Sequence, residues 1–206
     1  MKHYEKELPE GYREVYSIDA TSPKVSLILN LVVLVLFAAL FALALVPFFV
    51  GAMSFDLTSV ELILSIGSLI YLFLYIAYIV GHELVHGAAY KALTGEKLTY
   101  GFSATVAYCG VPNVYVYRKA SLIALLAPFV VFTILFGVAT VICAFVNSGA
   151  YIVCALLLVS HLAGCVGDLF VTFLFLTRFK SEDTLMRDTG PKQTFYLKFT
   201  EQQTNA

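Results

Sequence analysis

An all-α polytopic membrane protein with four transmembrane helices is the fold class that this sequence predicts, and two observations lead to it. The chain of 206 residues is 60% hydrophobic and only 13% charged, and its mean hydropathy is +0.85. Soluble domains carry about 25% charged residues. In addition, four apolar runs are each long enough to cross a bilayer, which takes about 20 residues. A net charge of −1 without a concentrated basic patch excludes a nucleic-acid-binding protein.

Polar and apolar segments divide the chain into three parts. We expect residues 1–24 to form a cytoplasmic N-terminal segment, because they are polar and of mixed charge. Residues 25–180 are predicted to form a four-helix membrane domain with a metal site, and residues 181–206 a cytoplasmic C-terminal tail with one strand-like stretch, 194–199. The four predicted spans are residues 25–50, 60–90, 120–146 and 150–177.

Lysine and arginine gather before the first predicted span, between the second and third, and after the fourth. Because cytoplasmic loops are enriched in these residues, both termini and the segment 91–119 are predicted to face the cytoplasm. Within that segment, strand-forming residues at 97–107 and 113–118 flank turn-forming residues at 108–112. This pattern predicts a short cytoplasmic β-hairpin or a re-entrant loop between helices two and three.

The second predicted span contains the HExxH pattern His82-Glu83-Leu84-Val85-His86. Helix residues four apart lie one above the other, so the two imidazoles can bind one zinc ion while Glu83 reaches an attacking water. Ionisable groups in a membrane helix are costly. A metal ion accounts for all three of them together.

A catalytic zinc usually takes three protein ligands, and two residues of the fourth predicted span can supply the third. At 1.5 Å per residue, Asp168 lies about 15 Å from the cytoplasmic end of its span and His161 about 25 Å. His82 lies about 13 Å from the cytoplasmic end of the second span. Depth therefore favours Asp168 as the third ligand. It leaves His161 as a buried, hydrogen-bonded histidine or a residue that supports a ligand.

Three residues of the predicted hairpin are further candidates for the site. Cys109 can block or regulate the metal from the loop, or it can be an ordinary thiol. Tyr108 and Asn113 are candidates for oxyanion support, on residue type alone. The cysteines show no pairing pattern, and we expect all four to be reduced.

The residues singled out above resemble those of the site-2-protease-like intramembrane zinc metalloproteases. They are closer still to a bacterial family of small membrane proteins described as zincin peptidases. The resemblance covers about residues 69–190 and includes the HExxH helix, Tyr108, Cys109 and Pro112, Leu126-Ala127-Pro128, and His161-x-x-Gly164-x-x-Gly167-Asp168.

The resemblance implies a zinc-binding core of three helices in a bacterial plasma membrane. It also implies His82 and His86 as ligands, an aspartate as the third ligand, and Glu83 as the catalytic acid and base. In one respect the chain departs from the site-2 protease pattern, which has an Asn-Pro-Asp-Gly-like context. Here Gly167 precedes the aspartate and Leu169 follows it.

The function expected from these features is hydrolysis of peptide bonds in membrane-associated or transmembrane substrates near the cytoplasmic side. The expected partners are a membrane protein or peptide substrate and the lipid bilayer. One alternative is a zinc-binding but catalytically silent membrane protein that binds partners, but a structural site does not need Glu83. A metal transporter is the last alternative. It should carry polar sites across the membrane, whereas the outer halves of the predicted spans are apolar apart from His161.

Overall fold

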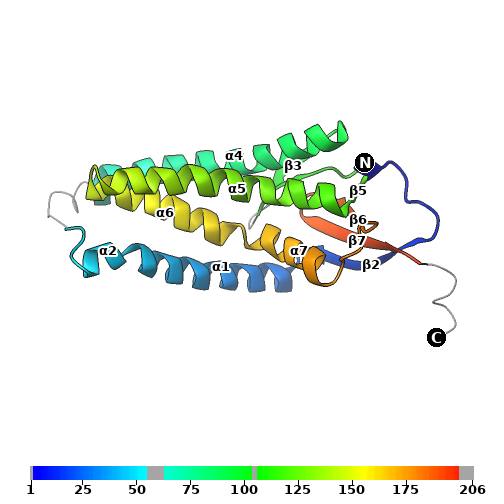
Figure 1. Cartoon of the computed structure of the whole chain (residues 1–206), viewed down its shortest axis with the longest axis horizontal. Coiled ribbons are helices and arrows are strands. Elements are labelled where there is room, and N and C mark those ends of the chain that lie inside the picture. The colour runs from blue at the N-terminus through cyan, green and yellow to red at the C-terminus, as the bar shows by residue number, and fades with distance from the viewer. Residues whose placement is uncertain (1, 55–62, 104–105, 200–206) are drawn as a thin grey trace. The chain divides into compact units, whose positions relative to one another are not determined.

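The computed structural model describes residues 2–54, 63–103 and 106–199, and the chain forms two compact units. The first unit comprises Met1–Ile28, Glu83–Ala127 and Gly167–Ala206, and the second comprises Leu29–His82 and Pro128–Val166. Their helices and strands are labelled in Figure 1.

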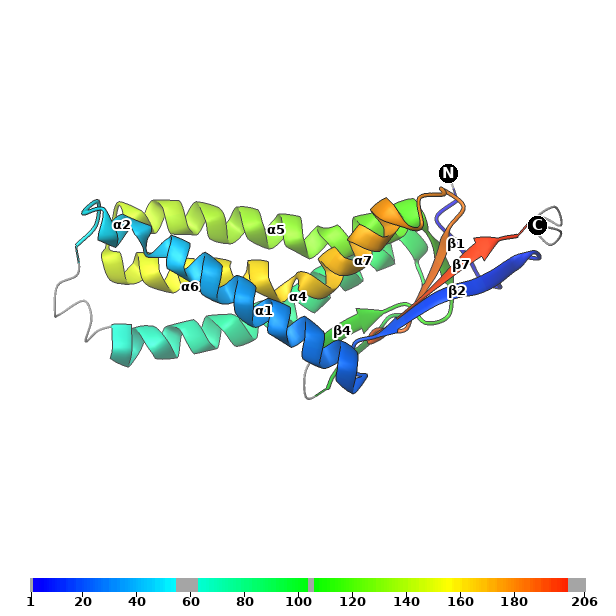
Figure 2. The same cartoon turned by 90° about the horizontal axis from the view of Figure 1, so that it is seen from below.

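The first unit is built on a five-stranded antiparallel sheet, so the prediction of an all-α protein is wrong. Figure 2 shows two of its strands, β2 and β7, lying side by side. In spatial order the strands are β1 (Tyr4–Glu5), β5 (Tyr115–Tyr117), β6 (Leu185–Asp188), β7 (Lys192–Lys198) and β2 (Tyr12–Asp19).

The sheet escaped the sequence analysis because its longest pairing joins the two ends of the chain. In the register of β2 with β7, Tyr12 lies opposite Lys198 and Asp19 opposite Lys192. An irregularity between Glu14 and Tyr16 shifts this register. A bulge of this kind interrupts the alternation of inward and outward side chains, which is the local signal of a strand.

One face of this sheet packs against α7 (Val166–Thr177). Phe195 of β7 is fully buried there and stacks on Phe179, with ring centroids 4.5 Å apart. Burying a phenylalanine side chain contributes about 1.5 to 3 kcal/mol. The buried members of this cluster are Leu125, Val171, Leu174, Phe175, Phe179, Met186 and Phe195.

The segment between the second and third predicted spans contains a hairpin, but its strands differ from those predicted. β3 (Thr99–Phe102) pairs antiparallel with β4 (Ala107–Gly110), so the predicted turn region 108–112 begins inside a strand. The predicted second strand at 113–118 contains β5, which joins the five-stranded sheet instead. The sequence pattern predicts Gly110 to be a turn former. A side chain there would overlap the backbone of Thr189 and Gly190, so close approach requires this glycine.

Among the described residues, three helical segments are long and apolar enough to cross a membrane: Pro23–Phe49, Ser65–Thr94 and Arg118–Ala144. The predicted fourth span is divided at Cys165 into α6 and α7, which together would count as a fourth. Residues 60–62 of the second predicted span lie outside the described residues. Besides α7, the helical elements in the described part of the chain are α1 (Pro23–Ala44), α2 (Val46–Phe49), the π-helix η1 (Ile63–Gly67), α4 (Ser68–Thr94), α5 (Arg118–Ala144) and α6 (Ser148–Gly164).

The second unit consists of packed helices. Asn147 caps α6, because its side chain accepts hydrogen bonds from the backbone N–H groups of Gly149 and Ala150. Tyr151 of α6 donates a hydrogen bond of 2.7 Å to the carbonyl oxygen of Ala44 at the end of α1. By contrast, α1 itself has no buried residue, as expected of a helix whose sides face lipid.

Candidate metal centre

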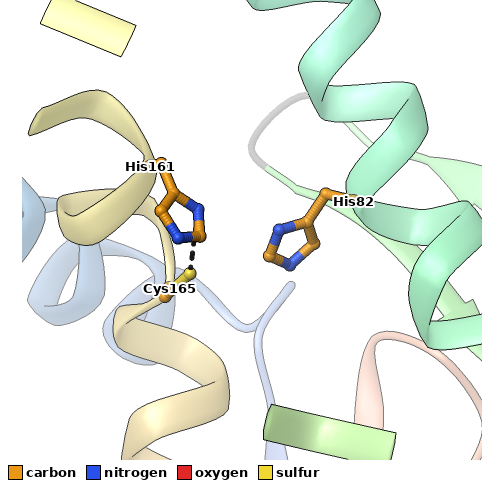
Figure 3. A group of neighbouring side chains, drawn as sticks. All are labelled: His82, His161 and Cys165. Atoms are coloured by element: carbon orange, nitrogen blue, oxygen red, sulfur yellow. Dashed lines mark hydrogen bonds between the residues drawn. The ribbon is translucent and has the colours of Figure 1, made fainter. Parts of the chain in front are cut away.

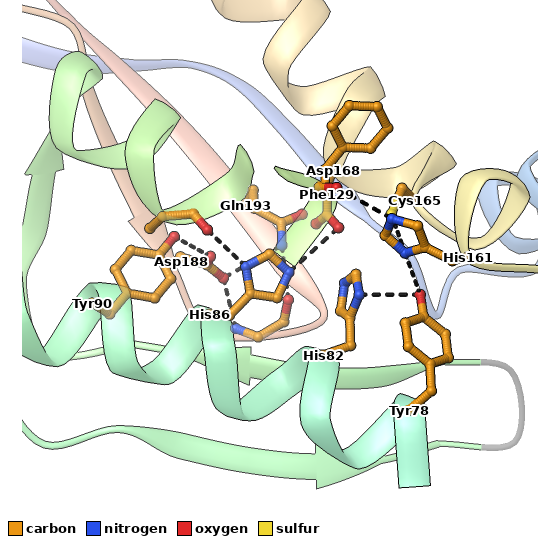
Figure 4. A network of polar contacts seen from close by, with 12 residues as sticks. Tyr78, His82, His86, Tyr90, Phe129, His161, Cys165, Asp168, Asp188 and Gln193 are labelled. Atoms are coloured by element: carbon orange, nitrogen blue, oxygen red, sulfur yellow. Dashed lines mark hydrogen bonds and ion pairs between the residues drawn. The ribbon is translucent and has the colours of Figure 1, made fainter. Parts of the chain in front are cut away.

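In the first unit, His86 of α4 contacts two other elements (Figure 4). Its Nε2 lies 3.3 Å from Oδ2 of Asp168, and its Nδ1 lies 2.9 Å from the carbonyl oxygen of Ala124. A carbonyl oxygen only accepts hydrogen bonds, so Nδ1 carries a hydrogen. Nε2 faces the carboxylate, and the two atoms need a proton or a metal ion between them.

Asp168 lies in the first turn of α7. A carboxylate is favourable there because the helix N-terminus carries a partial positive charge. The break at Cys165 places this residue at a helix start, whereas the hydropathy pattern predicts one continuous helix with this residue in its middle. Its side chain remains 22% exposed. The carboxylate is therefore partly open to a ligand.

His82, Glu83 and His86 all lie on α4, and helical spacing fixes their relation. The two histidines are one turn apart, and Glu83 lies one residue, about 100°, round the helix from His82. Both histidines are buried, at 8% and 6% exposure, whereas Glu83 is half-buried. The carboxylate is thus more accessible than the two imidazoles.

The hairpin lies against the same helix. A side chain at Gly87 would overlap the hydroxyl of Tyr100 and contact Leu98, so β3 approaches α4 one residue after His86. Cys109 of β4 is hydrogen-bonded to Tyr100. Burial raises the pKa of the Cys109 thiol to about 12, and the charges of Asp188 and Glu83 add to this effect. In the metal-free protein this thiol is therefore protonated at neutral pH.

The other two candidates from the hairpin region differ in their surroundings. The ring of Tyr108 lies against Gly101 and Gly190, where any side chain would overlap it. Its observed role is to pack β4 against the turn after β6. Asn113 is exposed in the turn that precedes β5.

In the second unit, His82 belongs to a buried chain of polar contacts with Tyr78 and His161 (Figure 4). The Tyr78 hydroxyl lies 3.2 Å from Nδ1 of His82 and 3.0 Å from Nδ1 of His161. Nε2 of His161 lies 3.1 Å from Oγ1 of Thr133 and 3.2 Å from the carbonyl oxygen of Phe129. His161 is fully buried and hydrogen-bonded on both nitrogens.

Cys165 lies beside this chain, and with His82 and His161 it forms a group of three side chains that could bind a metal (Figure 3). Their nearest ligand atoms all lie within 4.8 Å of one another. The sulfur of Cys165 is 3.6 Å from Nδ1 of His161. Within the part of the chain that the structure describes, no cysteine forms a disulfide.

Asp188, a buried carboxylate near the site, is not among the residues predicted from the sequence. It accepts hydrogen bonds from the Tyr90 hydroxyl at 2.7 Å, the Gly190 N–H at 2.9 Å and the Gln193 amide at 3.3 Å. Burial raises the pKa of Asp188 to about 6.

The two tyrosines that contact His82 and Asp188 did leave a signal in the sequence. Tyr78 and Tyr90 continue the four-residue spacing of His82 and His86 along α4, so helical periodicity could have found both tyrosines. Asp188 lies in the segment that was expected to be a tail, where no local pattern marks it.

The contact between His86 and Asp168 fits a zinc ion. Zinc binds imidazole nitrogen and carboxylate oxygen at about 2.0 to 2.1 Å, so two ligand atoms of one tetrahedral zinc lie about 3.3 Å apart. The observed separation of Nε2 and Oδ2 is 3.3 Å. A neutral histidine with Nδ1–H bound to a backbone carbonyl is also the usual arrangement of a zinc ligand.

The described residues thus combine helices that are long and apolar enough to cross a membrane with a histidine beside a carboxylate, which is a potential metal centre. A model of the family described as "Putative zincin peptidase" matches residues 74–183, just over half of the chain. The chain belongs to this family, which confirms the predicted zincin family and implies zinc and metallopeptidase activity. The likeness to site-2 proteases stays a prediction. No curated protein and no solved structure matches the chain.

Proposed function

We propose that this protein is an intramembrane zinc metalloprotease that hydrolyses peptide bonds of membrane-associated or transmembrane substrates near the cytoplasmic side. In this proposal both termini lie in the cytoplasm and the membrane is the plasma membrane of a bacterium. The observation that carries the proposal is the contact between Nε2 of His86 and Oδ2 of Asp168, beside Glu83 on the HExxH helix.

In this proposal His82, His86 and Asp168 hold the zinc ion. The two histidines are one turn apart on α4, as two ligands of one ion must be when both come from one helix. The spacing of His86 and Asp168 supports the third ligand. Three protein ligands leave one coordination position for chemistry.

When bound, zinc supplies the Lewis acidity that polarises a peptide carbonyl and acidifies water. The remaining chemistry belongs to Glu83. Its carboxylate accepts a proton from the attacking water and delivers that proton to the leaving nitrogen of the peptide bond. A half-buried carboxylate suits this role, because it can reach both water and substrate.

Within the described residues β3 pairs only with β4, and the other edge of β3 is the proposed place where the substrate binds. A transmembrane helix must unwind before its backbone can be cleaved, and an extended segment can then add to an exposed strand. Tyr100 and Phe102 of β3 are 46% and 69% exposed. Because β3 lies against Gly87, a strand added there would run close to His86.

The test compares wild type with Glu83→Gln in proteoliposomes that contain a membrane-peptide substrate. We expect the variant to keep its zinc and to lose cleavage by about 10²- to 10⁴-fold, the usual contribution of a general acid–base. Glu96→Gln is the matched control, because Glu96 lies in the loop after α4 and pairs with Lys6 at 3.5 Å. Undiminished cleavage by Glu83→Gln would exclude this mechanism. Proteomic comparison of membranes with the two forms then identifies the substrate.

A further inference from the structure

We propose that Cys143 and Cys154 are a redox-active pair that closes a disulfide between α5 and α6 on the outer side of the membrane. The oxidant is another disulfide in that compartment, that of a dithiol protein or of a small thiol such as glutathione. The inference goes beyond the proposed function and shares with it only the topology, in which both termini are cytoplasmic. Both cysteines belong to the second unit.

The sulfur atoms of the two cysteines are in contact. Sγ of Cys143 lies 3.5 Å from Sγ of Cys154, and the helices α5 and α6 that carry them lie side by side in Figure 1 and Figure 2. A disulfide bond measures about 2.05 Å, so the sulfurs are about 1.5 Å from bond distance. Rotation about the two Cα–Cβ bonds can close this distance without moving the helices.

The other two cysteines are less accessible. Cys109 is 6% exposed and hydrogen-bonded to Tyr100, and Cys165 is fully buried beside His161. Cys143 and Cys154 are both half-buried. Thiol–disulfide exchange requires access to the attacking sulfur, so exposure favours this pair over the other two thiols.

The pair lies near the ends of its helices. Cys143 is the last residue but one of α5, and Cys154 lies six residues, about 9 Å, after the start of α6 at Ser148. The turn between the helices contains the exposed Asn147, whose side chain caps α6. A polar exposed residue in an otherwise apolar stretch marks the membrane surface, where water and a soluble oxidant are within reach of the sulfurs.

The side of the membrane decides whether such a pair stays reduced. Helix α5 begins with Arg118 and Lys119, and the next basic side chain of lysine or arginine is Arg178. The positive-inside rule therefore places the start of α5 in the cytoplasm and the turn at its other end outside. Cytosolic thiols are kept reduced, whereas disulfides form and persist outside the cytoplasm.

The reaction is a thiol–disulfide exchange in two steps. One cysteine loses its proton to water, and its thiolate attacks a sulfur of the oxidant, which gives a mixed disulfide and releases one thiol. The thiolate of the second cysteine then attacks the protein sulfur of the mixed disulfide and releases the second thiol. Two cysteine thiols and one external disulfide become one protein disulfide and two external thiols. The new bond joins residues 11 positions apart and restricts the unfolded chain, which stabilises the helix pair.

The first experiment determines the state of the pair in native membranes. The membranes are quenched with acid, the full-length protein is denatured with N-ethylmaleimide present to block free thiols, and the protein is then digested with chymotrypsin. Phe145 and Tyr151 lie between the two cysteines, so cleavage after these aromatic residues leaves fragments that only a disulfide joins. We expect mass spectrometry to find the fragments joined, without maleimide, and to find them separated after reduction. Cys109 and Cys165 should carry maleimide.

The second experiment adds oxidised glutathione to purified, reduced protein in detergent. We expect the thiols to fall from four to two per chain, and the oxidised protein to unfold at a higher temperature than the reduced protein. Cys143→Ser should form no bond between two cysteines, and its unfolding temperature should not respond to the oxidant. Cys109→Ser is the matched control and should still form the bond to Cys154.

Maleimide on both Cys143 and Cys154 in native membranes would overturn the proposal, as would a bond from either of them to another cysteine. The detergent experiment would then give the reason. Closure by oxidised glutathione would mean that the turn lies on the reducing side of the membrane, against the proposed topology, whereas no closure would mean that the sulfurs do not reach bond distance. None of these measurements uses zinc or proteolysis. A protein that forms the bond but cleaves nothing would refute the proposed function and leave this inference standing.

Discussion

The buried carboxyl of Asp188 provides a test of the first unit that needs no substrate, and the change is Asp188→Asn. Asparagine has nearly the same shape but cannot ionise, so it mimics the protonated carboxyl. In wild type the carboxyl is 2% exposed, and burial raises its pKa from 3.8 to about 6. Tyr90, Gly190 and Gln193 donate to it. Asparagine can keep these contacts, since its amide oxygen accepts and its NH₂ group can donate to the tyrosine oxygen.

The magnitude follows from the difference between the pKa of Asp188 in the folded protein, about 6, and its ordinary value of 3.8, which applies to the unfolded chain. Between about pH 4 and pH 6 the folded protein keeps a proton that the unfolded chain has released, so the free energy of unfolding falls as pH rises. This contribution is complete below about pH 4 and is lost above about pH 6. Two pKa units at about 1.4 kcal/mol each amount to about 3 kcal/mol. The asparagine variant lacks this pH dependence. Its free energy of unfolding relative to wild type should therefore rise by about 3 kcal/mol between pH 4 and pH 7.

The assay is denaturant unfolding of chelator-treated protein in detergent at pH 4, 5, 6 and 7. The quantity compared is the difference in unfolding free energy between the two proteins, which cancels the groups that they share. Asp183→Asn removes the same charge at an exposed position in the loop before β6 and controls for net charge. A difference between wild type and Asp188→Asn that is constant from pH 4 to pH 7 would refute the assignment of a buried, titrating carboxyl.

Two further predictions concern the third zinc ligand and the packing of the hairpin. Asp168→Ala should lose most of its zinc, because it removes the carboxylate 3.3 Å from His86; near-stoichiometric zinc in the purified variant, measured by metal analysis, would remove Asp168 from the ligand set. Gly110→Ala should lower the free energy of unfolding by about 1 to 3 kcal/mol, the usual cost of overpacking, because the added methyl overlaps the backbone of Thr189 and Gly190. Gly137→Ala in α5, which would meet nothing within 4 Å, should not be destabilised in the same unfolding assay; equal losses in both variants would contradict the close approach at Gly110.

The apolar helices were predictable because membrane spans depend on local composition. An uninterrupted apolar run of about 20 residues predicts a helix wherever it occurs. The predicted spans at 25–50 and 120–146 therefore correspond closely to the helical segments Pro23–Phe49 and Arg118–Ala144. Hydropathy did not reveal the break at Cys165, because an apolar residue there continues the run while the backbone ends one helix and starts another.

The candidate site likewise has a part that could be predicted from the sequence and a part that could not. The spacing of His82, Glu83 and His86 is a property of one helix, so the motif could be found from five consecutive residues. The depth count also selected Asp168, whose carboxylate contacts His86, although its role as a ligand stays a prediction. Asp188 could not be found, because its partners come from α4 and from the residues that follow β6.

By itself, the sequence determined the apolar helices, the HExxH pattern on one of them and membership of a zincin peptidase family. Only the tertiary structure decided that the two polar ends of the chain form one sheet, with Tyr12 opposite Lys198. It also decided which carbonyl or hydroxyl each histidine contacts. The physical reason is range: composition and helical spacing act between neighbours in the chain, whereas strand pairing and hydrogen-bond direction depend on residues that folding alone brings together.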